Sequence, residues 1–326
     1  MDAFSYELKN NVLNAVPEPM VSIRTSAYNH AGYIRECIEG ILNQKTDFKF
    51  EYIIGEDFST DGTREIVFEY AEKYPDIIRV ITADRNLGMK MNGQRCIDAC
   101  RGKYIAICEG DDFWIDSYKL QKQVDYMESH PECAVCATEG YRLNQATGEM
   151  AELPTLGLET YTPQDFLEGN QIFTLTTLTR ASWAREFYTE IEPIAPRFMM
   201  GDYTLWLYML TRGTIHKLSD KCAVYRELSQ SASHYKDPYK QLRFAASSYD
   251  LRLFYNRLYK FSSSSMLFRK FKNIYLWCLH LAHEHNLKRR SLLWEGFKLC
   301  TIEAASLPSR KLRLAFKQLQ NKKALK

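Results

Sequence analysis

The chain has 326 residues, of which 45% are apolar and 25% charged, and its net charge is +3. This composition is typical of a soluble globular protein, and the 17 Phe and 21 Tyr exclude an intrinsically disordered chain. The sequence shows no apolar run of about 18 residues that could span a membrane and no evident secretory signal peptide. The nine cysteines are odd in number and scattered, which favours a reducing, cytoplasmic compartment over a disulfide framework.

Strands and helices are predicted to alternate in the first part of the chain, after a polar lead-in at residues 1–19. Short apolar, β-rich runs predict strands at 21–25, 52–54, 77–81 and 104–108. Apolar residues at helical spacing predict helices at 32–42, 64–74 and 92–100. This alternation predicts an α/β fold, in which a mostly parallel sheet has helices on both faces. Ligands of such sheets bind beyond the carboxyl ends of the strands.

The second part of the chain is predicted to become helical. Further strands are predicted at 133–136, 175–179 and 224–226, with a helix at 203–210. Cys133 and Cys136 form a C-x-x-C pair, but no second pair stands at zinc-site spacing, so a buried strand is the better interpretation. No strand is predicted after about residue 238. We therefore predict a domain over residues 20–237 and a helical extension over 238–326.

Acidic residues follow three of the four strands predicted up to residue 108. The most concentrated group is Glu109-Gly-Asp111-Asp112, whose three carboxylates repel one another unless a cation joins them. Mg²⁺ or Mn²⁺ prefers such oxygen ligands and can neutralise a departing diphosphate. The alternative is that Asp111 or Asp112 caps the next helix, and spacing alone does not decide between the two. For Glu56-Asp57, a turn that feeds a helix, with Asp61 or Thr63 as its cap, is the simpler explanation.

Three motifs in order resemble the signatures of glycosyltransferase family 2, whose members are inverting enzymes of the GT-A fold. They are residues 21–29 (VSIRTSAYN), 56–63 (EDFSTDGT) and 109–114 (EGDDFW). The resemblance covers roughly residues 20–235. It implies a GT-A domain that transfers a sugar from a nucleotide diphosphate, usually UDP, to an acceptor hydroxyl with the help of Mn²⁺ or Mg²⁺. Glu109 stands where the DXD motif usually has Asp, a form found in a bacterial branch of the family.

The resemblance also implies roles for individual residues. Contacts with the nucleotide sugar are expected from Thr25, Tyr28, Glu56, Asp57, Asn92, Glu109, Asp111 and Arg226. The metal is expected at Asp111, with Glu109, Asp112 and His234 as further candidates. Asp202, at the start of the predicted helix 203–210, matches the position of the general base that deprotonates the acceptor. It would also suit the cap of that helix.

The end of the chain is strongly basic. Residues 259–326 contain 15 Lys or Arg and three acids, so this segment has a net charge of +12 and the remainder −9. Residues 310–320 would form a basic amphipathic helix, which predicts peripheral contact with an anionic membrane. Packing on the acidic domain and a solvated helical face are the alternatives. The resemblance adds a glycan or lipid-linked glycan acceptor, used in capsule, O-antigen or lipopolysaccharide synthesis at the inner membrane face, and no nucleic acid partner.

Other functions are compatible with parts of the pattern. A non-catalytic interaction protein of the same fold would be expected to lose its acids at the strand ends, yet this chain keeps them. A sugar nucleotidyltransferase would carry a Gly-rich, basic loop after the first strand, which residues 25–30 lack. The G-x-G-x-x-G motif of a dinucleotide-binding oxidoreductase is also absent there.

Overall fold

The computed structural model describes residues 5–8, 18–191, 198–228, 236–261 and 266–305. The chain forms two compact units. The first, here called the sheet unit, comprises Met1–Thr162, Asn170–Thr189 and Tyr208–Leu228. The second, the helical unit, comprises Pro163–Gly169, Glu190–Leu207 and Ser229–Lys326, so two short segments from before residue 208 group with the C-terminal helices.

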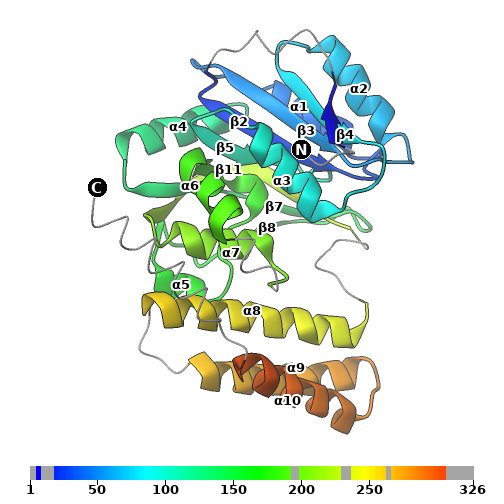
Figure 1. Cartoon of the computed structure of the whole chain (residues 1–326), viewed down its shortest axis with the longest axis vertical. Coiled ribbons are helices and arrows are strands. Elements are labelled where there is room, and N and C mark those ends of the chain that lie inside the picture. Colours follow the sequence, from blue (N-terminus) through cyan, green and yellow to red (C-terminus); the bar gives the residue numbers. More distant parts are fainter. Residues whose placement is uncertain (1–4, 9–17, 192–197, 229–235, 262–265, 306–326) are drawn as a thin grey trace. The chain divides into compact units, whose positions relative to one another are not determined.

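Among the described residues, eleven strands form one sheet in the sheet unit (Figure 1). Their order is β1-β4-β3-β2-β5-β10-β7-β11-β6, with β8 paired to β7 and β9 to β11. The strands are β1 (Ser5–Glu7), β2 (Val21–Ala27), β3 (Phe50–Glu56), β4 (Ile78–Ala83), β5 (Tyr104–Ile107), β6 (Phe113–Trp114), β7 (Cys133–Asn144), β8 (Met150–Glu152), β9 (Thr160–Tyr161), β10 (Leu178–Arg180) and β11 (Thr214–Glu227).

The four central strands β4, β3, β2 and β5 are parallel, as the alternation of strands and helices predicted. They are connected by α1 (Ile34–Leu42), α2 (Thr63–Lys73) and α3 (Met89–Ala99). The chain steps outward from β2 to β4 and then returns to β5 on the other side of β2. Right-handed crossovers therefore place α1 and α2 on one face of the sheet and α3 on the other. The order reverses between β2 and β5, which is the position where open α/β sheets bind ligands.

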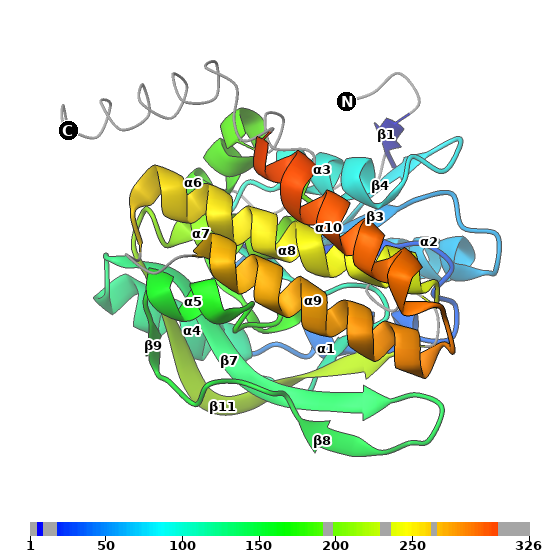
Figure 2. The same cartoon turned by 90° about the horizontal axis from the view of Figure 1, so that it is seen from below.

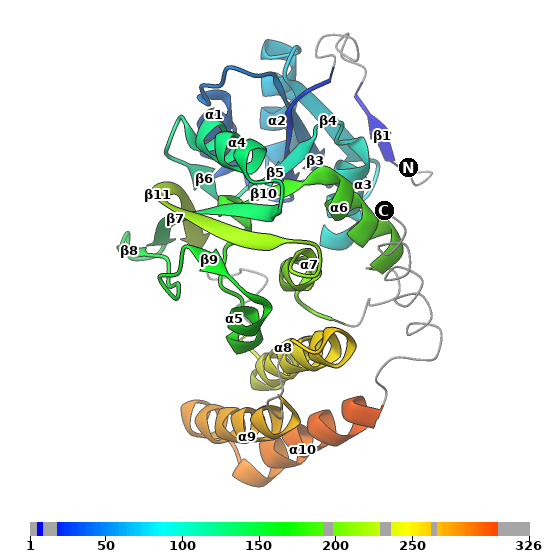
Figure 3. The ribbon, with the colours of Figure 1, turned by 90° about the vertical axis from the view of Figure 1, so that its left-hand side faces the viewer.

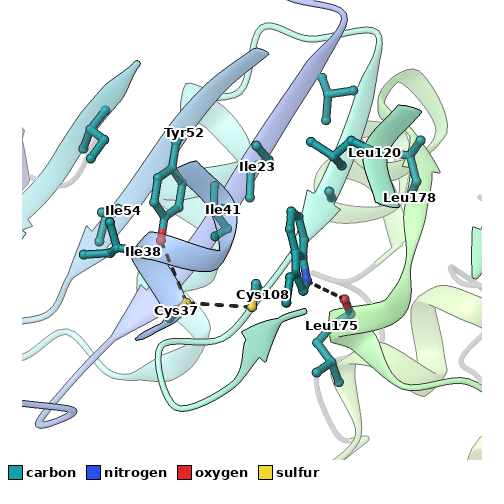
Figure 4. Packing of buried hydrophobic residues seen from close by; sticks show 14 of the residues in the cluster. Ile23, Cys37, Ile38, Ile41, Tyr52, Ile54, Cys108, Leu120, Leu175 and Leu178 are labelled. Carbon is teal, nitrogen blue, oxygen red and sulfur yellow. Dashed lines mark hydrogen bonds between the residues drawn. The ribbon is translucent and has the colours of Figure 1, made fainter. Parts of the chain in front are cut away.

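Helices cover both faces of this sheet (Figure 3), where α1 and α4 (Lys119–Ser129) lie opposite α3 and α6 (Ala181–Glu186). α6 continues into the π-helical turn η2 (Phe187–Ile191). The side of α1 that faces the sheet buries Ile34, Cys37, Ile38 and Ile41, at the helical spacing expected from the sequence. In the core beneath it (Figure 4), the thiol of Cys37 contacts the Tyr52 hydroxyl and the Cys108 thiol, and the Trp114 indole donates to the carbonyl of Leu175 at 2.9 Å.

The later strands are longer than their sequence pattern indicated. The predicted strand 133–136 is the start of β7, and 224–226 is the end of the 14-residue β11. These two strands pair in parallel with irregular register, and polar residues occupy their half-exposed positions, which hid the extent of the strands. The expected strand 175–179 is a 3₁₀ turn, η1 (Thr174–Thr176), followed by β10. All nine cysteines are buried, and none of them forms a disulfide.

The helical unit contains α5 (Pro163–Glu168), most of α7 (Gly201–Met209), α8 (Pro238–Tyr259), α9 (Met266–Glu284) and α10 (Arg289–Ala305). Helices α8, α9 and α10 run side by side (Figure 2) around a small apolar core. A buried ion pair, Asp250–Lys270 at 2.7 Å, joins α8 to α9. None of the described helices has both the length and the hydrophobicity needed to cross a bilayer.

Candidate active site

The loops that follow β2, β3 and β5 are bonded to one another at the carboxyl edge of the sheet. The Gly110 amide donates to the carbonyl of Ser26 at 3.1 Å, which ties the end of β5 to the end of β2. The loop after β2 is also bonded to the loop after β3, since the His30 amide donates to Thr63 Oγ1 at 2.7 Å and the Ala31 amide to Asp61 Oδ2 at 2.9 Å. The edge is therefore a fixed framework built by backbone donors.

Asp61 supports this framework, although neither it nor Thr63 occupies the cap position that the sequence suggested for them. Its Oδ1 accepts the Thr63 amide at 3.0 Å, at the start of α2. Gly62 occupies the cap position itself with φ = 101°, a conformation that favours glycine. The carboxylate thus serves both the helix start and the neighbouring loop, and the pKa of Asp61 is lowered because these donors outweigh its partial burial.

Glu56, Asp57 and Asn92 are buried, and their polar atoms are bonded to the protein. Glu56 accepts from the Ser59 amide at 2.6 Å and from the Thr82 hydroxyl at 2.8 Å. The two oxygens of Asp57 accept the amides of Leu87 and Gly88, at 2.9 and 2.8 Å, and so hold the loop between β4 and α3. The side-chain amide of Asn92 donates to the Gly55 carbonyl at 2.7 Å. In the described structure, these buried side chains therefore hold the loops at this edge of the sheet through hydrogen bonds.

Thr25 and Tyr28, both expected to line the nucleotide pocket, lie in different environments. Thr25 is fully buried, and its hydroxyl donates to the Cys108 carbonyl at 2.7 Å and accepts from Tyr52 at 2.9 Å. This corrects the expectation for Thr25, because its side chain points into the core between β2 and β5. Tyr28 is 45% exposed in the loop after β2, so its ring is accessible at the edge.

Glu109 is held by an arginine that the sequence analysis did not single out. Arg24 lies inside β2 and is nearly buried, and its Nη1 donates to Glu109 Oε1 at 3.3 Å. The same nitrogen contacts the Ser26 hydroxyl at 3.0 Å, whereas the Nε atom of Arg24 has no hydrogen-bond partner among the described residues. Burial is the largest single effect and lowers the pKa of Arg24, but Glu109 together with smaller contributions from other neighbours outweighs it, so the pKa of Arg24 is raised. The clue in the sequence was a charged residue within the apolar run VSIRTSA.

Asp112 is a buried support for the acidic loop and not a helix cap. The residues after it form β6, and the next helix, α4, begins only at Lys119, so the capping alternative is wrong for both Asp111 and Asp112. Asp112 Oδ1 accepts the amide of Arg226 at 2.8 Å. Burial raises the pKa of Asp112 well above its usual value, and the charge of the neighbouring Asp111 is the second largest cause of this rise.

Arg226 braces the same loop from β11. Its Nε donates to the carbonyl of Asp111 at 2.8 Å, its Nη1 donates to Gln145 at 2.7 Å, and its Nη2 contacts Glu36. The guanidinium also lies over the ring of Phe113, at 4.8 Å from the centroid. In the described structure Arg226 therefore positions the acidic loop, whereas the sequence suggested a phosphate contact.

The carboxylate of Asp111 is the least engaged of the three. Within the described part of the chain, no other residue donates a hydrogen bond to it, and no three acidic, His or Cys side chains come close enough to form a complete metal site. Burial raises the pKa of the Asp111 carboxyl. The neighbouring His30 partly offsets this rise, and the charge of Glu109 adds to it. The buried Nδ1 of His30 has no partner among the described residues, and a Cβ at Gly110 would lie 2.6 Å from it. One available carboxylate fits a cation whose other ligands are water and phosphate oxygens, as is usual for Mg²⁺.

With this geometry established, comparison with known proteins identifies the family. A family model described as glycosyl transferase family 2 matches residues 22–186, which is half of the chain. The chain belongs to glycosyl transferase family 2.

Two relatives each align with about two thirds of this chain. An uncharacterized protein of Mycobacterium tuberculosis is 35% identical over 215 residues, which are 66% of this chain and 60% of that protein. The putative teichuronic acid biosynthesis glycosyltransferase TuaG of Bacillus subtilis is 31% identical over 220 residues, covering 67% of this chain and 83% of TuaG. The chain therefore matches about 60% of the length of its mycobacterial relative.

Solved structures of glycosyltransferases share the fold. TarS of S. aureus (residues 1–349, in complex with UDP-GlcNAc) has a TM-score of 0.55 at 15% identity and covers 92% of this chain and 91% of its own. The mannosyltransferase PcManGT of Pyrobaculum calidifontis, in complex with GDP-Man and Mn²⁺, has a TM-score of 0.52 at 17% identity, with 95% and 81% covered. The α/β fold with a mainly parallel sheet and a helical C-terminal part is thus the one that the resemblance to family 2 implied.

The family pattern also suggested Asp202 as the general base and His234 as a contact of the metal. Asp202 is in the first turn of α7, which begins one residue earlier, at Gly201. It therefore sits inside the helix and not at its cap, where a carboxylate still interacts favourably with the positive end of the helix dipole. His234 lies outside the residues that the structure describes.

Proposed function

We propose that this family 2 protein is an inverting glycosyltransferase that moves a sugar from a nucleotide diphosphate, with UDP as the expected nucleotide, to an acceptor hydroxyl. One observation carries the proposal. At the switch point between β2 and β5, two of the three acids of the Glu-Gly-Asp-Asp motif are fixed by arginine contacts, and Asp111 is left available. A structural turn would have no reason to hold a half-buried carboxylate without a partner.

Asp111 is the proposed ligand of a divalent cation, Mn²⁺ or Mg²⁺. When bound, the cation would neutralise the negative charge on the departing diphosphate. Glu109, fixed by Arg24, would face the ribose or a water of the cation, and Asp112 would keep the loop in place through the Arg226 amide. His234 remains a candidate for contact with the cation. Tyr28 is proposed to line the nucleotide pocket and Asp57 to contact the base, with Glu56 and Asn92 in support.

Asp202 is the proposed general base. A carboxylate in the first turn of a helix interacts favourably with the positive end of the helix dipole, and a carboxylate can accept the proton of the attacking hydroxyl. Sugar transfer with inversion needs such an acceptor on the side of the ring opposite the leaving group.

A glycan or lipid-linked glycan is the proposed acceptor, in the synthesis of a surface polysaccharide at the cytoplasmic side of the membrane. Two facts support this part of the proposal. TuaG, 31% identical, is named for teichuronic acid biosynthesis. The C-terminal segment of this chain is also basic, which suits a protein working beside an anionic membrane.

Two isosteric substitutions test the proposal. Asp111→Asn should abolish most of the metal-dependent binding of UDP and most turnover, because the amide is a poor ligand for Mn²⁺. Asp202→Asn should retain donor binding but reduce sugar transfer by about 10²–10⁴-fold, since only the proton acceptor is lost. Isothermal titration with UDP and Mn²⁺, run beside a turnover assay, separates the two effects. Normal turnover in Asp111→Asn would contradict the metal assignment, and transfer within a few-fold of wild type in Asp202→Asn would mean that another residue is the base.

A further inference from the structure

Large apolar side chains are exposed on α9 and α10 of the helical unit. The exposed fraction is 60% for Trp294 and 69% for Phe268, and several neighbours are exposed by more than a third. We call the following residues the aromatic set: Phe268, Phe271, Tyr275, Leu276, Trp294 and Phe297. Trp277 of α9 is exposed as well, which makes seven such side chains on the two helices. Scattered single exposed residues are normal on a protein surface, but seven on two adjacent helices call for a partner.

These residues are not part of the core of the helical unit. That core is formed by other sides of the same helices, where Ile274, Cys278 and Leu281 of α9 pack with Leu242 of α8 and Leu292 of α10. Each helix therefore has one apolar side that is already buried and a second that faces solvent. Exposing the aromatic set is unfavourable in water, so the packing within the unit does not explain it.

Exposed cations lie among the aromatic set. On α9, Lys272 follows Phe268 by four residues and precedes Tyr275 by three, and on α10 the same spacing relates Arg290, Trp294 and Phe297. Residues at these intervals share one side of a helix. Lys288, Arg289 and Arg290 follow one another where α10 begins.

The exposed cations of α9 and α10 have no anionic partners among the residues that the structure describes. Within the described residues, none of Lys272, Lys288, Arg289 and Arg290 forms an ion pair, although all four are exposed. Acids on the same stretch are few: residues 266–305 contain seven Lys or Arg and three Glu. A surface that interleaves aromatic rings with unpaired cations is complementary to one ligand in particular, a sheet of anionic head groups over an apolar layer.

We propose that the exposed sides of α9 and α10 dock on an anionic lipid bilayer, with the rings of the aromatic set at the boundary between head groups and acyl chains. Lys272 and the run Lys288–Arg290 then contact the anionic head groups. The helices lie on the surface and do not cross it, since neither is long and apolar enough to do so. The contact thus lies within residues 268–297, upstream of the amphipathic stretch 310–320 that the sequence suggested. This inference goes beyond the proposed sugar transfer and does not depend on it.

Vesicle co-sedimentation of the full-length chain tests this surface. Vesicles of phosphatidylcholine with phosphatidylglycerol should pellet the protein, vesicles of phosphatidylcholine alone should not, and binding should fall as salt is added. The double variant Trp294→Ser/Phe297→Ser and the triple variant Lys288→Glu/Arg289→Glu/Arg290→Glu should each bind at least about tenfold more weakly. Both should keep the wild-type far-UV circular dichroism and melting temperature to within a few degrees, since the replaced side chains are exposed.

Matched controls and alternative occupants complete the test. Met150→Ser/Leu156→Ser removes two equally exposed apolar side chains from the sheet unit and should leave vesicle binding unchanged. Failure of the wild-type chain to pellet, or undiminished binding by both helical variants, would overturn the proposal. It would also be overturned if deletion of residues 306–326 abolished binding while both helical variants bound normally, because the anchor would then be the tail. Loss of a dimer in light scattering by these variants, without vesicle binding by the wild type, would assign the surface to a second copy of the chain.

Discussion

Replacing Asp112 by Asn and by Ala should separate support of the acidic loop from metal binding. Asp112 Oδ1 accepts the buried Arg226 amide at 2.8 Å, and Arg226 in turn donates to the Asp111 carbonyl at 2.8 Å. Asn keeps an acceptor oxygen at the same position and removes a negative charge that burial already disfavours. Asp112→Asn is therefore expected to keep the wild-type stability and most of the turnover.

Asp112→Ala is expected to behave differently because it leaves the buried Arg226 amide without an acceptor. An unsatisfied buried donor costs about 1–3 kcal/mol, and each kcal/mol lowers the melting temperature of a domain of about 150–250 residues by roughly 2–4 °C. The donor KM should also rise, because the loop that carries Asp111 loses the bond between Asp112 and the Arg226 amide of β11.

Thermal melts and turnover at varied Mn²⁺ measure both effects, with Asp111→Asn as the control that should lose activity without losing stability. The reasoning would be refuted if Asp112→Asn melted like wild type but lost activity as completely as Asp111→Asn. Asp112 would then be a ligand of the cation and not a support for the loop.

Three further predictions follow from buried contacts of the sheet unit. Arg24→Met should raise the donor KM by about tenfold, since a charged hydrogen bond to Glu109 is lost. Arg24→Lys should restore part of the affinity for the donor. Equal KM values in the two variants would argue against the idea that Arg24 positions Glu109. Glu51 is buried and bonded to Ser22 and to two arginines, which outweigh the effect of burial and lower the pKa of Glu51. The ionised Glu51 carboxylate therefore stabilises the fold above the pKa that this carboxyl has in the unfolded chain, and the stabilisation is lost as pH falls through its lower folded pKa. Glu51→Gln should lower the free energy of unfolding by about 3 kcal/mol at pH 7. It should also make the melting temperature less dependent on pH in the acid range. Gly102→Ala should destabilise the protein by at least about 1 kcal/mol, because its Cβ would lie 2.5 Å from the backbone nitrogen of Ser22, whereas Gly32→Ala, with no atom within 4 Å, should not.

The parallel half of the sheet could be predicted because its strands are buried on both faces. Val21–Ala27 and Ile78–Ala83 are almost continuous buried runs, and amphipathic helices separate them from their neighbours. The long strands β7 and β11 could not, because polar side chains occupy their half-exposed positions and the register between them is irregular. A pattern of apolar residues detects burial, so it located only the buried core of each long strand.

The candidate site was predictable in position but not in the detail of its bonding. Acids at the ends of β3 and β5 indicated the ligand-binding edge, and the structure brings these loops together. The sequence could not show that Asp57 bonds to the amides of Leu87 and Gly88, nor that Arg24 reaches Glu109, because both contacts join segments distant along the chain. The resemblance to family 2 implied that Thr25 lines the pocket, although the strand turns its side chain into the core.

Release of nucleoside diphosphate from a panel of nucleotide sugars tests the central claim most directly. The purified full-length protein should release the diphosphate from at least one sugar donor, UDP sugars first among them, when Mn²⁺ or Mg²⁺ is present. Excess chelator and the Asp111→Asn substitution should each remove this activity. Undiminished release in excess chelator or by Asp111→Asn, or no release from any donor by a correctly folded protein with metal and glycan acceptors supplied, would contradict the account.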